Sequence, residues 1–186
     1  MNAIPSVDLL EFTSGVPDRK KDFVEKIGKA FEEIGFVALS GHFLTDSLVE
    51  ELYGEVKNFF GLPDAVKKKY EIDGLGGQRG YTSFGKEHAK GREEGDLKEF
   101  WHFGQYVEGD AALAEEYPDN IYVEELPAFN SVGETAYKML EKTAVYVLRA
   151  LALHLQLHET YFDGYVHNGN SILRPIHYPP ISEEPK

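Results

Sequence analysis

Two histidines that lie four residues apart, His154 and His158, are the first candidates for chemistry in this sequence. On a helix this spacing places both imidazoles on one face, where they could share a metal ion with Glu159 as a third ligand. The segment reads HLQLHE, however, and lacks the His-Glu-x-x-His order of helical zinc sites. Histidines near the C-terminal end of a helix are also favoured by the helix dipole. We therefore favour a structural role for the pair and keep a metal site as the alternative.

A glycine-rich segment, DGLGGQRG at residues 73–80, raises the question of phosphate binding. Closely spaced glycines can present backbone N–H groups to an anion. Here Arg79 stands where the third glycine of a dinucleotide-binding fingerprint would fall, no strand is expected before the segment, and Gly-Lys-Ser/Thr does not occur. We interpret the segment as a loop that leads into a strand.

The strand-like segment SILRPIHY, residues 171–178, carries an arginine and a tyrosine among aliphatic residues. Because side chains alternate between the two faces of a strand, Arg174 and Tyr178 share one face. A wholly buried strand would rarely contain both groups without partners for them. On composition alone, the simpler interpretation is that both reach solvent at the ends of the strand. Pro175 and Pro179 have no N–H to donate, which predicts a sheet edge or a bulge.

Composition limits the class of protein. Of the 186 residues 42% are hydrophobic, which is enough for a packed core, so disorder is not expected. A formal net charge of −13 argues against nucleic acid or an anionic membrane as the main partner. The absence of cysteine excludes disulfides and Cys-ligated metals, and it favours a cytoplasmic location. No signal peptide is expected, and the apolar stretch AVYVLRALAL is too short for a membrane span and contains Arg149.

Hydrophobic spacing predicts three main helices and several short strands. The helices are expected at residues 18–35, 45–61 and 127–158, with a short one after Pro63. In the first, Phe23, Ile27, Phe31 and Ile34 share one face; in the last, the inward positions are Val132, Ala136, Met139 or Leu140, Val147, Leu151 and Leu155. Strands are expected at residues 4–9, 36–40, 81–85, 98–107 and 171–178, that at 36–40 as a buried one, and a surface loop at 108–126.

Five segments resemble, in order, the amino-terminal part of the isopenicillin N synthase-like, non-haem iron(II) and 2-oxoglutarate-dependent oxygenases. IPSVDL is similar to the family's Ile-Pro-x-Ile-Asp-Leu, and AFEEIGFVALSGHF to its Ala-x-x-x-x-Gly-Phe-x-x-x-x-x-His-Gly segment, with Phe43 in place of the usual glycine. FFGLPDAVKKKY resembles its Phe-Phe-x-Leu-Pro-x-x-x-Lys stretch, and GQRGYTSFGKE with DLKEFW resembles the loop and strand that follow. ILRPIHYPP resembles its Leu-Arg-x-x-x-Tyr-Pro-Pro strand. The resemblance covers essentially the whole chain.

The resemblance implies an α+β fold, namely the amino-terminal helical and strand region of a double-stranded β-helix, or jelly roll. The intact enzyme of such a family holds Fe(II) by two histidines and one carboxylate and takes 2-oxoglutarate, dioxygen and a small-molecule substrate. The family's His-x-Asp motif does not occur here, because none of the seven histidines has an aspartate two residues on. We expect that motif beyond Lys186, so that the metal-binding part of the barrel is missing from this chain and the chain alone binds no iron through the family triad.

The resemblance also implies roles for three residues. Tyr178 matches the tyrosine of the Tyr-Pro strand, which lines the cavity of relatives and donates to the carboxylate of the co-substrate or of a substrate, as a neutral phenol does well. The asparagine that plant relatives carry two residues earlier is Ile176 here. Arg79 resembles the arginine that reaches a substrate carboxylate in isopenicillin N synthase, and with Tyr81 it is assigned to substrate binding.

The chain would then divide into residues 1–126, the amino-terminal region; 127–170, a scaffold helix and turn; and 171–186, the first strand of the jelly-roll core. Its expected function is that of the amino-terminal part of an Fe(II)- and 2-oxoglutarate-dependent dioxygenase acting on a small molecule. The alternative is a non-catalytic binding or scaffold module derived from that family. An incomplete barrel would leave an unpaired strand edge that is prone to association.

Overall fold

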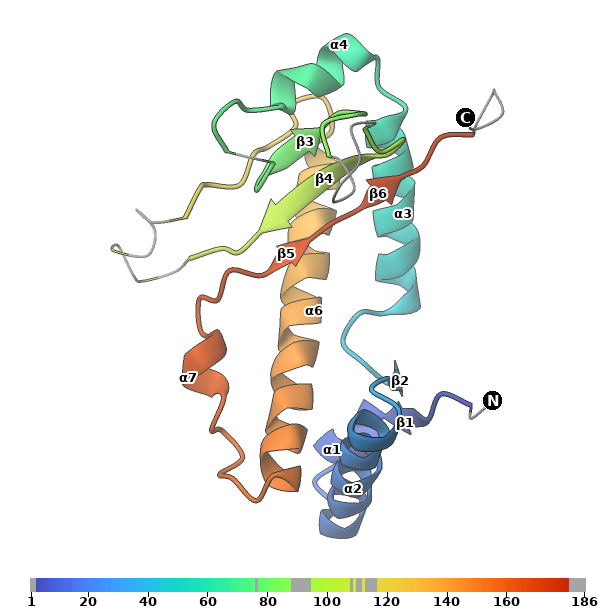
Figure 1. Ribbon diagram of the computed structural model, residues 1–186, viewed down its shortest axis with the longest axis vertical. Coiled ribbons are helices and arrows are strands. Elements are labelled where there is room, and N and C mark those ends of the chain that lie inside the picture. Colours follow the sequence, from blue (N-terminus) through green and yellow to red (C-terminus); the bar gives the residue numbers. More distant parts are fainter. Residues whose placement is uncertain are drawn as a thin grey trace. The chain divides into compact units, whose positions relative to one another are not determined.

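The computed structural model describes residues 3–75, 77–87, 95–107, 109, 112 and 117–180. Contacts divide the chain into two compact units, each built from segments that are distant in the sequence. Unit 1 contains Met1–Asp46 and Lys138–Gly169, and unit 2 contains Ser47–Tyr137 and Asn170–Lys186. The long helix α6 (Pro127–His154) contributes residues to both units (Figure 1).

Unit 1 combines a two-stranded parallel sheet with helices. Strands β1 (Ser6–Asp8) and β2 (Ala38–Ser40) pair with each other, and α1 (Leu9–Thr13), α2 (Pro17–Glu33) and α7 (Asp163–Val166) join the C-terminal half of α6. The carboxylate of Asp8 accepts the N–H of Leu10 and caps α1. Helix α2 ends where the sequence predicts, because Gly35 adopts φ +80° and its N–H donates to the carbonyl of Ala30.

The core of unit 1 lies between α1, α2 and α6. Its buried members are Val7, Leu9, Phe12, Phe23, Ile27 and Ala150. Phe31, expected on the buried face of α2, is 39% exposed, so that prediction is wrong. The prediction of a buried strand at residues 36–40 is also wrong: Ala38 and Ser40 are exposed, because β2 pairs only with the short β1 and has no second sheet neighbour among the described residues.

Helix α6 ends earlier than the sequence predicts. Gln156 adopts φ +60°, and the N–H of Leu157 donates to the carbonyl of Ala152, which is the six-residue closure of a Schellman motif. The helix therefore stops at His154 rather than at residue 158. Leu155, expected on the inward face, is 58% exposed since it already belongs to this turn.

Unit 2 is built on the central strand β4 (Glu99–Gly104), which pairs antiparallel with β3 (Gly80–Thr82) on one side and with β5 (Ile172–Leu173) and β6 (Ile176–His177) on the other (Figure 1). Helices α3 (Asp46–Phe60) and α4 (Asp64–Lys67), the 3-10 turn η1 (Lys68–Tyr70) and the start of α6 accompany this sheet. Helix α3 ends just before Gly61, as the sequence predicts.

The core of unit 2 is largely aromatic. Phe59 stacks on Phe129 at 4.9 Å between ring centroids and meets Trp101 edge-on at the same separation. Gly133 of α6 lies directly against Phe103: a Cβ at this glycine would lie 2.2 Å from the ring. The first turns of α6 therefore pack closely on one face of β4, which a larger residue at position 133 would prevent.

The segment predicted as one strand at residues 171–178 forms two short strands. The break lies at Arg174 and Pro175, and the carbonyl of Pro175 still accepts the N–H of Trp101 at 3.1 Å. Within the described part of the chain β5 and β6 pair only with β4, so the proline occupies a break in an edge strand, as its missing N–H requires.

Candidate functional site

The two faces of β4 have different surroundings. Side chains alternate along a strand, so Glu99, Trp101 and Phe103 point to the aromatic core, whereas Phe100 and His102 point to the opposite face. All of these side chains are buried. The candidate site consists of the polar groups on these two faces.

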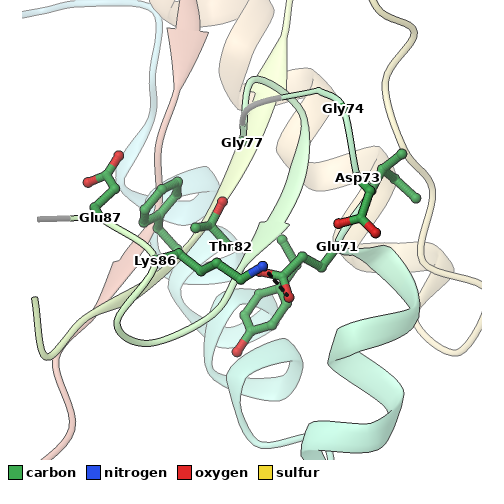
Figure 2. Close-up of a pocket in the computed structure, with 10 residues that line it drawn as sticks. Glu71, Asp73, Gly74, Gly77, Thr82, Lys86 and Glu87 are labelled. Atoms are coloured by element: carbon green, nitrogen blue, oxygen red, sulfur yellow. Dashed lines mark ion pairs between the residues drawn. The ribbon is translucent and has the colours of Figure 1, made fainter. Parts of the chain in front are cut away.

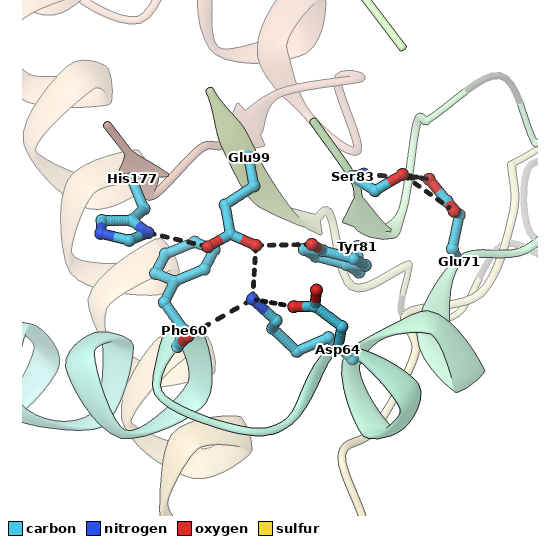
Figure 3. A network of polar contacts seen from close by, with 8 residues as sticks. Phe60, Asp64, Glu71, Tyr81, Ser83, Glu99 and His177 are labelled. Carbon is cyan, nitrogen blue, oxygen red and sulfur yellow. Dashed lines mark hydrogen bonds and ion pairs between the residues drawn. The ribbon is translucent and has the colours of Figure 1, made fainter. Parts of the chain in front are cut away.

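On the core face, the carboxylate of Glu99 is the centre of a buried polar network (Figure 3). One carboxylate oxygen accepts hydrogen bonds from Lys67 Nζ at 2.7 Å and from the hydroxyl of Tyr81. The other oxygen accepts a hydrogen bond from Nδ1–H of His177 at 2.7 Å. Lys67 Nζ also contacts the carboxylate of Asp64 at 3.2 Å. The network thus joins α4, β3, β4 and β6 through one carboxylate.

The burial of this network makes its charges interdependent. Lys67 and Glu99 are 4% and 1% exposed, so each ion depends on the other for the stabilisation that water would otherwise give. Burial and the hydrogen bond to Glu99 raise the pKa of Tyr81 well above its usual range. The phenol therefore stays protonated and acts as a donor at neutral pH.

On the opposite face, a neutral histidine meets an arginine. His102 Nδ1–H donates to the carbonyl of Gly77, and Nε2 accepts from Arg174 Nε. Burial, followed by the positive charge of Arg174, lowers the pKa of His102 to about 4. The Arg174 guanidinium lies 4.3 Å from the centroid of the Phe100 ring and 3.3 Å from a carboxylate oxygen of Glu87. The face therefore presents a fixed cation on an aromatic ring.

A cavity of about 280 Å³ opens beside this face (Figure 2). It is lined by Glu71, Ile72, Asp73, Gly74, Gly77, Tyr81, Thr82, Lys86, Glu87 and Phe100. Glu71 accepts the N–H and the hydroxyl of Ser83, both at 2.9 Å, and lies 3.8 Å from Lys86 Nζ. The buried hydroxyl of Thr82 has no hydrogen-bond partner among the described residues. The cavity offers carboxylates, one ammonium group and a free hydroxyl to a polar molecule.

Arg79, predicted to bind substrate, is 1% exposed. Its guanidinium lies so close to Gly104 that a Cβ there would be 1.8 Å from Cζ. Nη1 donates to the carbonyl of Gln78 at 2.7 Å, but Nε and Nη2 have no hydrogen-bond partner among the described residues. Burial lowers the pKa of Arg79. A buried guanidinium with two unused donor atoms has capacity to bind an anion, and the substrate role stays a prediction.

The two predicted tyrosines differ in their surroundings. Tyr81 is buried and lines the cavity of Figure 2, while its hydroxyl is used by Glu99. Tyr178, predicted to bind the co-substrate, follows β6 and is 67% exposed. Its neighbour His177, rather than Tyr178, reaches the buried network. The structure thus brings Tyr81 together with His177, and the role of Tyr178 stays a prediction.

The histidine pair of α6 is used separately. His154 Nε2 lies 2.9 Å from a carboxylate oxygen of Glu32, whereas His158, beyond the end of the helix, bonds the hydroxyl of Thr160. Within the described ranges, no group of three histidine, aspartate, glutamate or cysteine side chains is arranged to hold a metal ion. Each imidazole therefore has its own polar partner, and the structural role of the pair stays a prediction.

Glu99, Lys67 and His102 are not among the residues predicted from the sequence. The sequence does contain an indication of Glu99. In the strand KEFWHFG its side chain lies on the same face as that of Trp101, two residues later. A carboxylate on the face of a buried tryptophan needs a buried partner. Nothing in the local sequence identifies that partner as a lysine 32 residues earlier.

The chain matches a known family model. Residues 4–125 match the family described as "non-haem dioxygenase in morphine synthesis N-terminal". Among curated proteins, the chain is 31% identical over 186 residues to proline hydroxylase buaE of Petromyces alliaceus and 26% identical over 205 residues to the 2-oxoglutarate-dependent dioxygenase imqE of Aspergillus flavus. Each alignment covers 96% of this chain and 56% of the relative, so the chain spans about half the length of the curated relatives it matches.

Solved structures show the same relationship. A 2OG-Fe(II) oxygenase family protein from Caulobacter crescentus superposes with a TM-score of 0.86 at 35% identity, over 99% of this chain and 59% of that one. A full-length Neurospora crassa protein, solved in complex with alpha-KG, superposes with a TM-score of 0.77 at 25% identity, over 96% of this chain and 54% of that one. No described helix is both long and apolar enough to cross a membrane.

Proposed function

Because the chain belongs to the non-haem dioxygenase N-terminal family, we propose that it is the amino-terminal part of an oxygenase that uses Fe(II), 2-oxoglutarate and dioxygen to oxidise a small molecule in the cytoplasm. The family match over residues 4–125 carries this proposal. The edge strand β5–β6 supports it, because further strands of a jelly roll could pair there.

We infer that this chain by itself does not hold the iron of such an enzyme. The family's His-x-Asp motif does not occur in the sequence, and no suitable group of three ligands exists among the described residues. We therefore propose that the iron ligands of the intact enzyme come from further polypeptide. The contribution of this chain is then to shape and charge one wall of the cavity.

Within that wall, three side chains have proposed roles. Tyr178 donates its hydroxyl to a carboxylate of the co-substrate, and Arg79 with Tyr81 binds the substrate. Support for Arg79 comes from its Nε and Nη2 atoms, which have no hydrogen-bond partner within the part of the chain that the structure describes. Support for Tyr178 comes from its exposed phenol beside the edge strand. A Tyr178→Phe change in the intact enzyme is expected to weaken 2-oxoglutarate binding about ten- to one-hundredfold, which is the usual effect of losing one hydrogen bond to a charged group.

Iron titration tests the proposal. The 186-residue chain is mixed with Fe(II) and 2-oxoglutarate without dioxygen, and the weak visible band of the iron–2-oxoglutarate complex is followed; we expect none. A longer polypeptide that adds the remaining barrel of the parent should give the band and should convert 2-oxoglutarate to succinate. Tight stoichiometric iron binding by the 186-residue chain, or an inactive longer polypeptide, would contradict the proposal.

The alternative, a non-catalytic binding or scaffold module, makes a different prediction for the chain alone. Such a module should unfold cooperatively and bind little of a dye specific for apolar surface. An amino-terminal part of a larger barrel should bind the dye and associate through its strand edge.

A further inference from the structure

A second cavity, of about 450 Å³, lies in unit 2 at the C-terminal end of β4. It is lined by Gln105, Tyr106, Val107, Tyr117, Pro118, Asp119, Asn120, Tyr122 and Glu134. None of these residues lines the cavity of Figure 2. Phe100, which does, is five residues before Gln105, or about 17 Å along an extended chain. The two cavities are therefore separate.

Asn120 fixes the walls of this second cavity. Its side-chain oxygen accepts the N–H of Gly104 at 2.7 Å, and its side-chain nitrogen donates to the carbonyls of Gly104 and Gln105 at 3.0 and 3.2 Å. The asparagine amide thus continues the hydrogen bonding of β4 into the segment around residues 117–122. Such side-chain bonds to the backbone hold both walls in a defined position before any ligand binds.

Gln105 is the unusual member of the lining. It is 5% exposed, and neither its side-chain nitrogen nor its side-chain oxygen has a hydrogen-bond partner among the described residues. A buried amide with no partner is unfavourable, so buried amides in proteins normally meet a protein group, a water molecule or a ligand. Because Gln105 lines the cavity, a ligand that both donates and accepts a hydrogen bond could pair with the oxygen and the nitrogen of its amide.

The remaining lining residues favour a positive charge. Tyr106, Tyr117 and Tyr122 contribute aromatic rings, Asp119 and Glu134 contribute carboxylates, and the described lining residues include no lysine, arginine or histidine. Burial, followed by the charge of Glu134, raises the pKa of Tyr106, so its ring stays neutral. The positive charge of Arg79 acts on the pKa of Tyr106 in the opposite direction, but more weakly. Aromatic faces and carboxylates together attract organic ammonium ions.

We propose that this cavity binds a small organic ammonium ion that also carries a hydroxyl or amide group, with the rings of Tyr106, Tyr117 and Tyr122 around the cation and Gln105 bonded to the polar group. A volume of about 450 Å³ suits a molecule of this size. The proposal goes beyond the oxygenase function and does not depend on it, because its test requires neither iron nor 2-oxoglutarate.

Calorimetric titration of the 186-residue chain with choline tests the proposal. The matched control ligand is 3,3-dimethyl-1-butanol, which replaces the ammonium nitrogen of choline by carbon and keeps the hydroxyl group. We expect choline to bind at least about tenfold more tightly, since the neutral isostere loses attraction to the rings and the carboxylates. Equal affinity for the two molecules, or no heat from either, would overturn the proposal.

Three variants then locate the site. Gln105→Leu is expected to weaken choline binding about five- to tenfold without lowering the melting temperature, because it removes an unpaired buried amide. Tyr122→Leu should weaken binding about threefold or more. Tyr53→Leu, at another exposed tyrosine, which lies on α3 outside the cavity, should have no effect. If Gln105→Leu and Tyr122→Leu both fold and bind choline as the parent does, the assignment to this cavity is wrong.

Discussion

The carboxylate of Glu99 and the imidazole of His177 are joined by a hydrogen bond of 2.7 Å. This bond connects the exposed edge strand β6 to the buried ion pair of Lys67 and Glu99. His177 itself is 39% exposed, and its ring stacks on Phe60. One end of the hydrogen bond therefore lies in the core and the other lies at the surface where further strands could add.

Replacing Glu99 by alanine should destabilise unit 2 strongly. The change leaves the buried Lys67 with the exposed Asp64 as its remaining charged partner among the described residues, and breaking a buried ion pair typically costs about 3–5 kcal/mol. Urea unfolding followed by the fluorescence of Trp101, the single tryptophan, measures this loss. Glu51→Ala, at an exposed position of α3, is the matched control and should change stability by less than about 0.5 kcal/mol. Equal effects of the two changes would contradict the interpretation.

Gly104 and Arg79 should be energetically coupled. A Cβ at position 104 would lie 1.8 Å from Arg79 Cζ, so Gly104→Ala is expected to cost about 1–3 kcal/mol through overpacking. In an Arg79→Ala background the same change meets no guanidinium and should cost little. A double-mutant cycle in urea gives the coupling energy, expected to exceed about 1 kcal/mol. Strict additivity of the two changes would show that the close approach is absent in solution.

Stability should decrease as the pH is lowered through a window set by His102. In the folded chain its pKa is about 4, whereas an unfolded histidine titrates near 6.5, so the unfolded state takes up the proton first as pH falls. The contribution of His102 to the free energy of unfolding is therefore fully present above about pH 6.5. Up to about 3 kcal/mol of it is lost as the pH falls to about 4. Carboxyl groups also titrate at the acid end, so the clearest interval is from about pH 6.5 to about pH 5.

The measurement is urea unfolding at successive pH values in the parent and in His102→Gln. Glutamine can keep one hydrogen bond but has no proton to take up in this range. The slope of stability against pH in the variant should be smaller by up to about 1.4 kcal/mol per pH unit. If both proteins give the same slope, His102 is not the group responsible.

The sequence predicted those parts of the fold that depend on local signals. Helix α2 ends just before Gly35 as expected, because only a residue that tolerates a positive φ fits that position easily. The hydrophobic spacing predicts a last helix that is too long. Gln156 adopts a φ of +60°, which a glutamine in the sequence does not indicate. A glutamine at this position is held in the left-handed region by the closure of the helix end, which depends on the surrounding structure.

The candidate site was only partly predictable for a similar reason. Arg79 and Tyr81 were identified by their resemblance to family motifs, and Tyr178 by its place in a Tyr-Pro strand. The polar pairs of the site join distant segments: Glu99 is 18 residues from Tyr81, and Arg174 is 72 residues from His102. Spacing within one segment carries no information about such pairs, because only the sheet pairing brings them together.

Replacing Gly28 should destabilise unit 1, although glycine is usually unfavourable in the middle of a helix. A Cβ there would lie 2.2 Å from the imidazole of His154, so α2 and α6 approach closely at this glycine. Gly28→Ala is expected to cost about 1–3 kcal/mol, although alanine favours helix. Gly54, in the middle of α3 with nothing within 4 Å of its Cβ position, is the matched control, and Gly54→Ala should stabilise by about 0.5–1 kcal/mol.

Circular dichroism during thermal unfolding measures both glycine variants, and a third variant identifies the cause. In a His154→Ala background the imidazole is gone, so Gly28→Ala should cost much less than in the parent or become favourable. The hydrogen bond of His154 to Glu32 is lost in both members of that comparison and cancels from it. If Gly28→Ala costs as much without the imidazole as with it, the close contact between Gly28 and His154 cannot be the reason for the loss.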